Sequence, residues 1–323
     1  MLSFEQLCQR IEQSKNKKVM ITFHSIGDTD AISSALGISA LLGNAHISSP
    51  DFLSANARLV LESFGMDQKD ITNGFIKDAE LIVMVDVNNF EDCGSFETDL
   101  RNASCEILVI DHHAPSKVDR DLLIFNDEGY NSTASIVYDI FKNLGVAPDK
   151  RMAEALAIGI IADSAEFKNA TAHSFVQIGE LLSNAGLSYQ ELTEKFSRVA
   201  PPEIRLGTLK DLFNSEIAVI NKMLFLKGET QSHAAAAADD AIKIGVDIAL
   251  VASESEKEIS FSARCRPPLD KERQFHLGKI MKSIAKTIDG VGGGHPCAAG
   301  AYGTKKEGKA EFIKMFENEV FYK

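Results

Sequence analysis

The chain has 323 residues, of which 45% are hydrophobic and 25% charged, as in an ordinary soluble globular protein. This length predicts two domains, and no apolar run approaches the roughly 20 residues of a membrane span, so we expect no membrane association. The formal net charge of −12 argues against binding to duplex DNA, which depends on many phosphate contacts.

The N-terminus and the cysteines predict a cytoplasmic protein. The segment 1–18 is polar and mixed in charge, without the apolar core of a signal peptide. The cysteines are five in number, and none form a Cys-x-x-Cys pair. This pattern suits a reducing compartment in which the thiols are core or bystander residues.

The first part of the chain alternates strand-like and helix-like segments. We expect, in chain order, a strand at 19–23, helices at 31–42 and 54–64, strands at 81–85 and 107–110, and helices through most of 132–197. Ser54 is a plausible N-cap of the second helix. Between the last two strands lies a polar segment, 88–104. Alternating strands and helices predict an α/β fold with a parallel sheet.

A second pattern follows Pro201-Pro202, a dipeptide that interrupts regular structure. It begins with a connecting helix at 203–215. We then expect strands at 216–220, 223–226, 247–252, 258–263 and 298–302, helices at 234–243, 276–288 and 306–320, and a glycine-rich loop at 290–294. The predicted organisation is a first α/β domain over 1–190, a linker helix over 191–215 and a smaller α/β domain over 216–323.

Acidic and histidine side chains follow apolar runs at four places in the first domain. These are His24-Ser25-Ile26-Gly27-Asp28-Thr29-Asp30, Asp86, Asp111-His112-His113 and Asp163. Side chains just past the strand ends of an open parallel sheet converge on one crevice. Carboxylates crowded together there repel one another unless a cation holds them. The sequence therefore predicts a metal site.

The mixture of imidazole and carboxylate ligands favours Mn²⁺, with Mg²⁺ or Co²⁺ as alternatives. Two such ions sharing a carboxylate lower the pKa of a bridging water and stabilise charge on a phosphoryl group. The arrangement predicts phosphoester cleavage by a metal-bridged hydroxide.

The second domain offers candidate ligand-binding residues. Arg264 lies at the end of a predicted strand, where its guanidinium could bind a phosphate. For Arg266, the sequence favours a ligand contact and an ordinary surface position equally. The run Gly292-Gly293-Gly294-His295 leaves backbone amides free to approach a phosphate closely. Residues 255–323 carry 13 Lys/Arg and 9 Asp/Glu, a net +4, which leaves −16 on the remaining residues. A small basic surface of this kind suits a short phosphate-bearing ligand.

Together these motifs resemble the DHH phosphoesterase superfamily, which includes RecJ-type exonucleases and nanoRNases with 3′-phosphoadenosine-phosphate phosphatase activity. The four acidic segments resemble its four motifs, and the Gly-Gly-Gly-His run resembles the hallmark of its associated C-terminal domain. Two departures are Gly27, where a proline is frequent, and Ser132-Thr133-Ala134-Ser135, which lacks a final glutamate that relatives often have. Ser132 and Thr133 could still cap the following helix.

The resemblance implies a role for each matching residue. One metal would be bound by His24, Asp28 and Asp86, and the other by Asp30, Asp86, His112 and Asp163, with Asp86 shared. Two catalytic residues are implied: Asp111 would orient a histidine, and His113 would contact the substrate phosphate. The substrate would also be held by residues of the second domain across a cleft, namely Arg264, Gly293, Gly294 and His295.

We therefore expect an Mn²⁺-dependent phosphodiesterase or phosphatase that binds nucleic acid only as short substrates. Candidates are short oligoribonucleotides, 3′-phosphoadenosine phosphate and linear dinucleotides. One alternative is a RecJ-like exonuclease on single-stranded DNA, although the chain has no Trp and only five Tyr for base stacking. Another is a non-catalytic nucleotide sensor. The sequence leaves the natural substrate and the oligomeric state open, a homodimer included.

Overall fold

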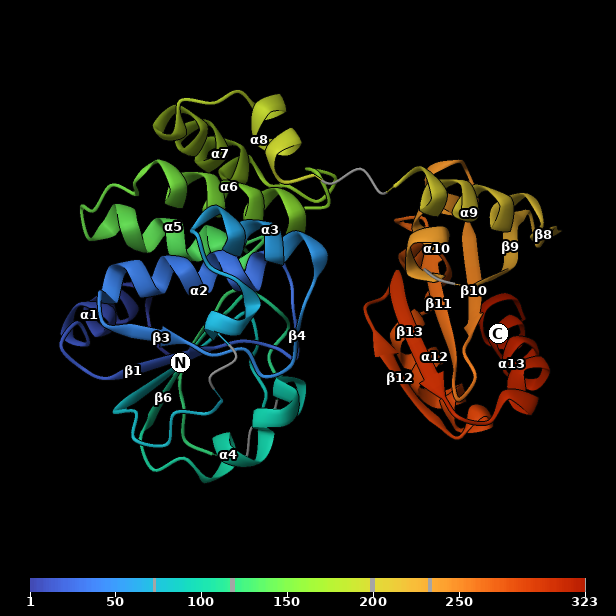
Figure 1. The fold of residues 1–323 in the computed structure, drawn as a ribbon, viewed down its shortest axis with the longest axis horizontal. Helices are drawn as coiled ribbons and strands as arrows, with labels where there is room; N and C mark the ends of the chain where they lie inside the picture. The colour runs from blue at the N-terminus through green and yellow to red at the C-terminus, as the bar shows by residue number, and fades with distance from the viewer. Residues whose placement is uncertain (72–73, 117–119, 198–200, 232–233, 323) are drawn as a thin grey trace. The chain divides into compact units, whose positions relative to one another are not determined.

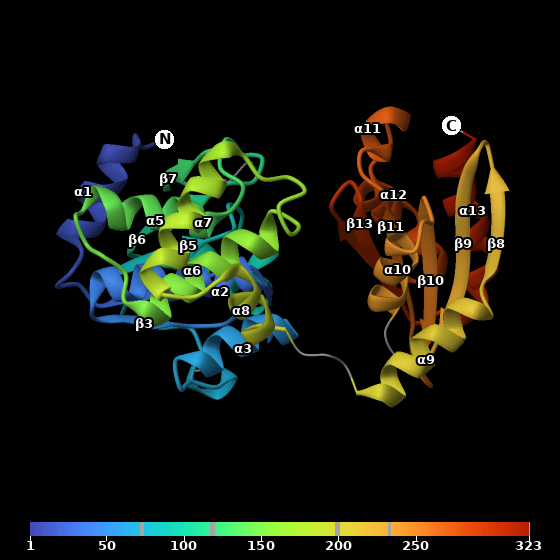
Figure 2. The ribbon, with the colours of Figure 1, turned by 90° about the horizontal axis from the view of Figure 1, so that it is seen from above.

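The computed structural model describes residues 1–71, 74–116, 120–197, 201–231 and 234–322. Its contacts divide the chain into two compact units, Met1–Arg198 and Val199–Lys323. Each unit has its own main sheet (Figures 1 and 2) and its own cores of buried apolar side chains. No helix within the described ranges is both long and apolar enough to span a lipid bilayer.

Unit 1 is built from short strands alternating with helices. In chain order its elements are α1 (Phe4–Gln13), β1 (Val19–Thr22), β2 (Ile26–Gly27), α2 (Thr29–Leu42), β3 (Ala45–Ile47), β4 (Phe52–Leu53), α3 (Ala55–Ser63), the 3-10 helix η1 (Gln68–Ile71), β5 (Leu81–Val85), η2 (Glu91–Phe96), α4 (Glu97–Asn102), β6 (Glu106–Asp111), β7 (Leu123–Asn126), α5 (Thr133–Asn143), α6 (Lys150–Asp163), α7 (Ala172–Ala185) and α8 (Tyr189–Lys195).

The main sheet of unit 1 is parallel throughout, with the strand order β3-β1-β5-β6-β7. Strand β3 lies on one side of β1, and β5, β6 and β7 follow on the other side. The direction in which the chain adds strands therefore reverses between β1 and β5. In open parallel sheets, ligands bind at such a reversal, beyond the carboxyl ends of the strands. The order of the strands therefore places a crevice where β1 and β5 end.

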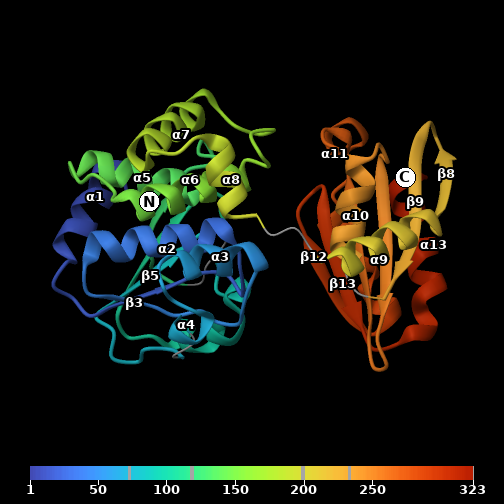
Figure 3. The ribbon, with the colours of Figure 1, turned by 45° about the horizontal axis from the view of Figure 1, so that its top comes forward.

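Both faces of this sheet are buried, which explains why its strands are continuous apolar runs. Ile21, Val83 and Leu108 belong to one core, while Met20 and Ile82 belong to the core of the opposite face. Figures 1 and 3 show α2, α5, α6 and α7 stacked on the first face and α4 on the other. The parallel sheet predicted from the sequence is confirmed.

Several helix ends follow from local capping. The Ser54 side chain accepts a hydrogen bond from the Ala57 N–H at the start of α3, as predicted, and Ser132 caps α5 in the same way through Ser135. Helix α1, the edge strands β3 and β7, and the short helices within the polar segment 88–104 were not anticipated. The strands lie at an edge and the helices of segment 88–104 are short, so each contributes few apolar positions to a sequence pattern. Helix α1 has 10 residues, of which only Leu7, Cys8 and Ile11 are buried.

Unit 2 contains a mixed sheet. Its elements are α9 (Pro202–Phe213), β8 (Glu216–Ile220), β9 (Met223–Thr230), α10 (Ala234–Lys243), β10 (Ile248–Glu254), β11 (Ile259–Cys265), α11 (Leu269–Arg273), α12 (Leu277–Ile284), η3 (Ala285–Ile288), β12 (Gly290–Gly294), β13 (Ala298–Gly303), η4 (Lys306–Gly308) and α13 (Lys309–Phe321). The strand order is β12-β13-β11-β10-β9-β8, with β9 and β10 parallel and the other pairs antiparallel.

The prediction of a glycine loop at 290–294 is wrong, because these residues form the edge strand β12. A side chain at several of these positions would collide with a neighbouring backbone. A Cβ on Gly290 would lie 2.0 Å from the Tyr302 carbonyl oxygen, and one on Gly292 would lie 2.7 Å from that of Met281. The glycines therefore allow strand β12 to pack closely against β13 and α12. Glycine content alone does not distinguish such a strand from a loop.

Candidate metal centre and substrate residues

The predicted metal-binding segments reach one place from three strands and two helices of unit 1. His24 follows β1, Asp86 follows β5, and His112 follows β6. Asp28 is the N-cap of α2, where its side chain accepts a hydrogen bond from the Ala31 N–H at 3.0 Å. Asp163 is the last residue of α6, so it arrives from a helix and not from a strand end.

The first cluster contains His24, Asp28 and Asp86, whose ligand atoms all lie within 4.8 Å of one another. His24 Nε2 is 3.8 Å from Asp28 Oδ1 and 3.5 Å from Asp86 Oδ2. The Asp28 carboxylate is partly open to solvent, whereas that of Asp86 is buried. The arrangement offers one nitrogen and two carboxylate groups to a single ion.

The second cluster contains Asp30, His112 and Asp163. His112 Nε2 is 3.1 Å from Asp163 Oδ2, 4.0 Å from Asp30 Oδ2 and 3.5 Å from Asp86 Oδ1. Although three carboxylates surround it, this buried nitrogen makes no hydrogen bond of acceptable geometry with any described residue. A buried polar atom without a partner is costly.

Asp86 connects the two clusters. Its Oδ2 atom faces His24, and its Oδ1 atom faces His112 and also His113 Nδ1, at 3.7 Å. Its backbone has φ of +59°, which is uncommon for a residue with a side chain, and such strained positions concentrate at functional sites. The Thr133 hydroxyl donates a hydrogen bond to Asp86 Oδ1 at 3.0 Å and fixes the carboxylate further.

Asp30 is held by the start of α5. Its two carboxylate oxygens accept hydrogen bonds from the backbone N–H groups of Thr133 and Ala134, at 2.6 and 2.8 Å. The first N–H groups of a helix have no partner within the helix and carry its positive dipole end, so they suit a buried carboxylate. Helix α5 therefore fixes both Asp30 and, through Thr133, Asp86.

The two residues predicted to be catalytic form a second chain of hydrogen bonds. His113 Nδ1 lies 2.8 Å from Asp111 Oδ1, and Asp111 Oδ2 accepts from Asn88 Nδ2 at 2.6 Å. The His113 ring is partly exposed, while Asp111 is buried. A carboxylate on one ring nitrogen fixes the orientation of a histidine, so the other nitrogen is presented in a defined direction.

The pKa values of the histidines show how strongly this site attracts positive charge. Burial alone lowers the pKa of His24, but Asp28 and Asp86 outweigh it and raise the pKa to about 10. Burial likewise lowers the pKa of His112, while Asp163 and Asp86 raise it to about 11. The pKa of His113 is also raised, against burial, by Asp111.

The carboxyl groups shift in opposite directions. Burial, with the charges of Asp86 and Asp163, raises the pKa of Asp30 well above its usual value. Burial also tends to raise the pKa of Asp86, but contacts with His112 and His24 hold it well below its usual range. The cluster therefore favours the charged form of Asp86 and the neutral form of Asp30. Carboxyl groups that share one buried site behave in this way, because they repel one another when both are charged.

These observations fit divalent metal ions. The clustered carboxylates, the buried His112 nitrogen without a well-oriented hydrogen bond and the raised histidine pKa values all favour a bound cation, and nitrogen with carboxylate oxygen is a suitable donor set. His24, Asp28 and Asp86 would hold one ion. Asp30, Asp86, His112 and Asp163 would hold the other.

The predicted substrate residue Arg264 is engaged within unit 2. It lies on β11, and its Nε atom donates to Asp239 Oδ1 of α10 at 2.6 Å. Its side chain is only 20% exposed. Arg266 is similarly paired with Asp247, at 2.8 Å. Each guanidinium therefore has an intramolecular carboxylate partner that a phosphate ligand would share or displace.

The other predicted substrate residues lie at the end of β12, in the case of Gly293 and Gly294, and in the turn that follows it, in the case of His295. His295 is exposed, and its N–H donates to the Ala298 carbonyl oxygen at 2.7 Å. Its own carbonyl oxygen accepts from the N–H of Gly278, in the first turn of α12, at 3.1 Å. Gly294 has φ of +129°, which favours glycine, whereas a Cβ on Gly293 would meet no atom within 4 Å. The space at Gly293 is open.

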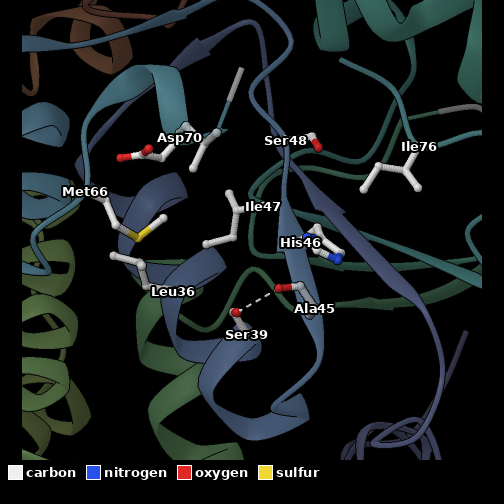
Figure 4. A pocket seen from close by; sticks show the side chains of 10 residues that line it. Leu36, Ser39, Ala45, His46, Ile47, Ser48, Met66, Asp70 and Ile76 are labelled. Atoms are coloured by element: carbon white, nitrogen blue, oxygen red, sulfur yellow. Dashed lines mark hydrogen bonds between the residues drawn. The ribbon is translucent and has the colours of Figure 1, made fainter. Parts of the chain in front are cut away.

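A separate cavity of about 180 Å³ lies beside β3 (Figure 4). Figure 4 shows Leu36, Ile47 and Met66 pointing toward one another on one side of the strand. None of the predicted site residues is part of its described lining, and it is smaller than typical ligand pockets. We assign it no role in the site.

Sequence reasoning missed Asn88 and the contacts of Thr133 with the acidic cluster. Asn88 follows Asp86 by two residues, and its amide also donates to the Ala114 carbonyl oxygen at 3.1 Å. Thr133 was recognised only as a helix cap. Polar residues close after a strand-end acid are the signal that could have identified Asn88, but nothing in the local sequence relates Thr133 to Asp86.

Comparison with known families matches residues 18–160 to the DHH family, N-terminal domain, and residues 217–320 to the DHHA1 domain. An uncharacterized protein of Methanocaldococcus jannaschii is 30% identical over 318 residues, which span 95% of this chain and 94% of that protein. A probable manganese-dependent inorganic pyrophosphatase of Streptococcus mutans is 27% identical over 182 residues, which span 54% of this chain and 57% of that protein.

Among solved structures, an exopolyphosphatase-related protein from Bacteroides fragilis is similar, with a TM-score of 0.79 at 18% sequence identity. The similarity covers 98% of this chain and 95% of that one. At this level of identity the two chains share a fold over nearly their whole length.

Proposed function

This chain belongs to the DHH family and carries a DHHA1 domain, and from this membership we propose that it is an Mn²⁺-dependent phosphoesterase of short nucleotidic substrates. The observation that carries the proposal is the position of Asp86. One carboxylate oxygen faces His24 and the other faces His112, so a single side chain can serve two ions. Two bound cations would activate a water and stabilise charge on a phosphoryl group.

The protein groups around the ions would position the phosphoryl group. His113 is oriented by Asp111 through Nδ1, so its other ring nitrogen can donate a hydrogen bond to a phosphoryl oxygen. Asp30 and Asp86 are fixed by the start of α5 and need not reorganise when a substrate binds. In unit 2, Arg264 and the turn at His295 would bind the remainder of the ligand.

The charge of the chain supports a short substrate. Residues 1–254 carry a net charge of −16, so each further phosphate of a long strand would lie over an acidic surface and gain little. Each phosphate contact adds about one unit of slope to the log–log dependence of binding on salt. A short ligand therefore predicts a shallow salt dependence.

The test is kcat/KM with Mn²⁺ for single strands of 2, 5 and 24 nucleotides at two ionic strengths. Linear dinucleotides, 3′-phosphoadenosine phosphate and pyrophosphate complete the panel. We expect the dinucleotide to be cleaved best and kcat/KM to fall with length. A marked preference for the 24-mer with a steep salt slope would instead support a RecJ-like exonuclease. Tight binding without turnover of any substrate would support a nucleotide sensor.

A further inference from the structure

Two cysteines of unit 2 oppose each other at the end of a strand pair. The β11–β13 register pairs Arg264 with Ala298, so the next position places Cys265 opposite Cys297. The Cys265 N–H donates to the Cys297 carbonyl oxygen at 2.9 Å. Opposed residues of antiparallel strands have Cα atoms about 4.5–5.5 Å apart, within the range of about 4.4–6.8 Å that a disulfide requires.

The two thiols differ in accessibility. Cys265 is 3% exposed and packs in the core of unit 2, whereas Cys297 is partly exposed in the turn that follows β12. The neighbouring Cys297 side chain, together with burial, raises the pKa of the Cys265 thiol. Because Cys297 is the more exposed of the two, a small solute in water meets this thiol first.

We propose that Cys265 and Cys297 are a thiol oxidation site, at which a peroxide produces a reversible disulfide. The Cys297 thiolate attacks one oxygen of hydrogen peroxide, which gives a sulfenic acid and releases one water once the thiol proton is counted. The Cys265 sulfur then attacks the Cys297 sulfur. The S–S bond forms, the S–O bond breaks, and hydroxide leaves with the Cys265 proton as a second water. Two thiols lose two electrons, and the peroxide gains them.

The position of the pair explains why this bond would matter to unit 2. Cys265 directly follows Arg264, and Cys297 lies two residues after His295. The turn is already tied to α12, because the N–H groups of Leu277 and Gly278 donate to the carbonyl oxygens of Pro296 and His295. A disulfide would add a covalent link from this turn to the end of β11. Its formation depends only on residues of unit 2 and does not depend on the proposed function.

The test uses the full-length reduced protein and hydrogen peroxide, followed by thiol alkylation and mass mapping. We expect a loss of 2 Da, a linked Cys265–Cys297 peptide pair, and complete reversal by a dithiol reductant. Cys297→Ser should abolish the link, and circular dichroism would verify its fold. The matched control is Cys105→Ser, which removes another partly exposed thiol, in unit 1, and should leave the link unchanged.

Three results would overturn the proposal. One is oxygen addition at Cys297 that never proceeds to a link with Cys265. A second is a disulfide between other cysteines at the same peroxide dose. The third is no reaction at the pair while Cys105 is modified. The wild-type peptide map decides the question even if the buried substitution Cys265→Ser fails to fold.

Discussion

The predicted metal ligands of unit 1 and the predicted substrate residues of unit 2 are held in different ways. Asp30 and Asp86 are buried and fixed by hydrogen bonds from the start of α5. Arg264 is instead paired with Asp239, and His295 lies on an exposed turn. A rigid cluster suits ions that need fixed distances, whereas the residues of unit 2 would contact the substrate and not the ions. Substitutions of the metal ligands in unit 1 should therefore affect metal binding and turnover together, and substitution of Arg264 or His295 in unit 2 should affect substrate binding without affecting metal binding.

The largest expected effect is that of Asp86→Asn. Asparagine tolerates the positive φ of this position, so the fold should persist while the shared charge is lost. We expect turnover to fall by roughly 10³-fold or more and both Mn²⁺ ions to be lost. Isothermal titration and single-turnover kinetics measure this, with Asp121→Asn on the exposed surface as the control. Normal activity in a folded Asp86→Asn protein would exclude the two-ion site.

A second prediction concerns pH. In the metal-free protein His24 and His112 have pKa values raised to about 10 and about 11, so Mn²⁺ must displace protons to bind. Affinity should rise about tenfold per pH unit for each displaced proton, or about 100-fold between pH 6 and 8 for one proton. Calorimetric titration with Mn²⁺ in buffers of different ionisation enthalpy measures the number of protons released per ion bound. Affinity that does not change with pH would contradict these protonation states.

The same shifts predict how the metal-free protein responds to pH. The folded pKa of His24 lies above the unfolded value of about 6.5. Its contribution to stability is therefore complete below pH 6.5 and is lost as the pH rises toward 10. The unfolding temperature without metal should fall across this range, and Mn²⁺ should raise it most at the alkaline end.

Much of unit 1 could be predicted from sequence because apolar runs and strand-end acids are local signals. The runs 81–85 and 107–110 are strands of the sheet, and Asp86 and Asp111 lie at or just beyond their ends. The contact of Thr133 with Asp86 could not be predicted, because it joins residues 47 positions apart and depends on how α5 packs on the sheet. Local patterns contain no information about such a distance.

Unit 2 was less predictable for a related reason. The strands near Arg264 and the helix at 234–243 were located, but nothing in the local sequence relates Arg264 on the strand to Asp239 on the helix. The glycines of β12 were interpreted as a loop because their purpose, close contact with α12 and β13, involves the backbones of distant residues. Residue type alone does not distinguish space for a ligand from space for a neighbouring strand.

Arg264→Ala tests the surface of unit 2. If Arg264 binds a substrate phosphate, its loss should raise KM roughly 10- to 100-fold, the effect of one hydrogen bond to a charged group, without changing Mn²⁺ affinity. Asp239→Ala is the matched variant, because it removes the competing carboxylate and should leave KM equal or lower. If Arg264→Ala lowered Mn²⁺ affinity as much as it raised KM, Arg264 would not act on substrate binding alone.

Thr133→Val should have a smaller effect in unit 1. It keeps the shape of the buried side chain but removes the hydroxyl that donates to Asp86. Loss of a partner that orients a metal ligand typically lowers affinity or activity, and here we expect about a tenfold decrease in both. Thr133→Ser retains a hydroxyl and should restore most of the activity. If Val and Ser behave alike, the hydroxyl does not position Asp86.

The smallest effects separate two adjacent glycines of β12. A Cβ on Gly292 would lie 2.7 Å from the Met281 carbonyl oxygen, so Gly292→Ala should lower the free energy of unfolding by about 1–3 kcal/mol, as overpacking does. A Cβ on Gly293 would meet no atom within 4 Å, so Gly293→Ala should leave stability within about 0.5 kcal/mol of the original. Chemical denaturation measures both.

If the Gly293 backbone also approaches the ligand, Gly293→Ala will raise KM severalfold in a protein of normal stability, because the methyl group would occupy the space the phosphate needs. An unchanged KM would mean that the open space at Gly293 is not part of the substrate site.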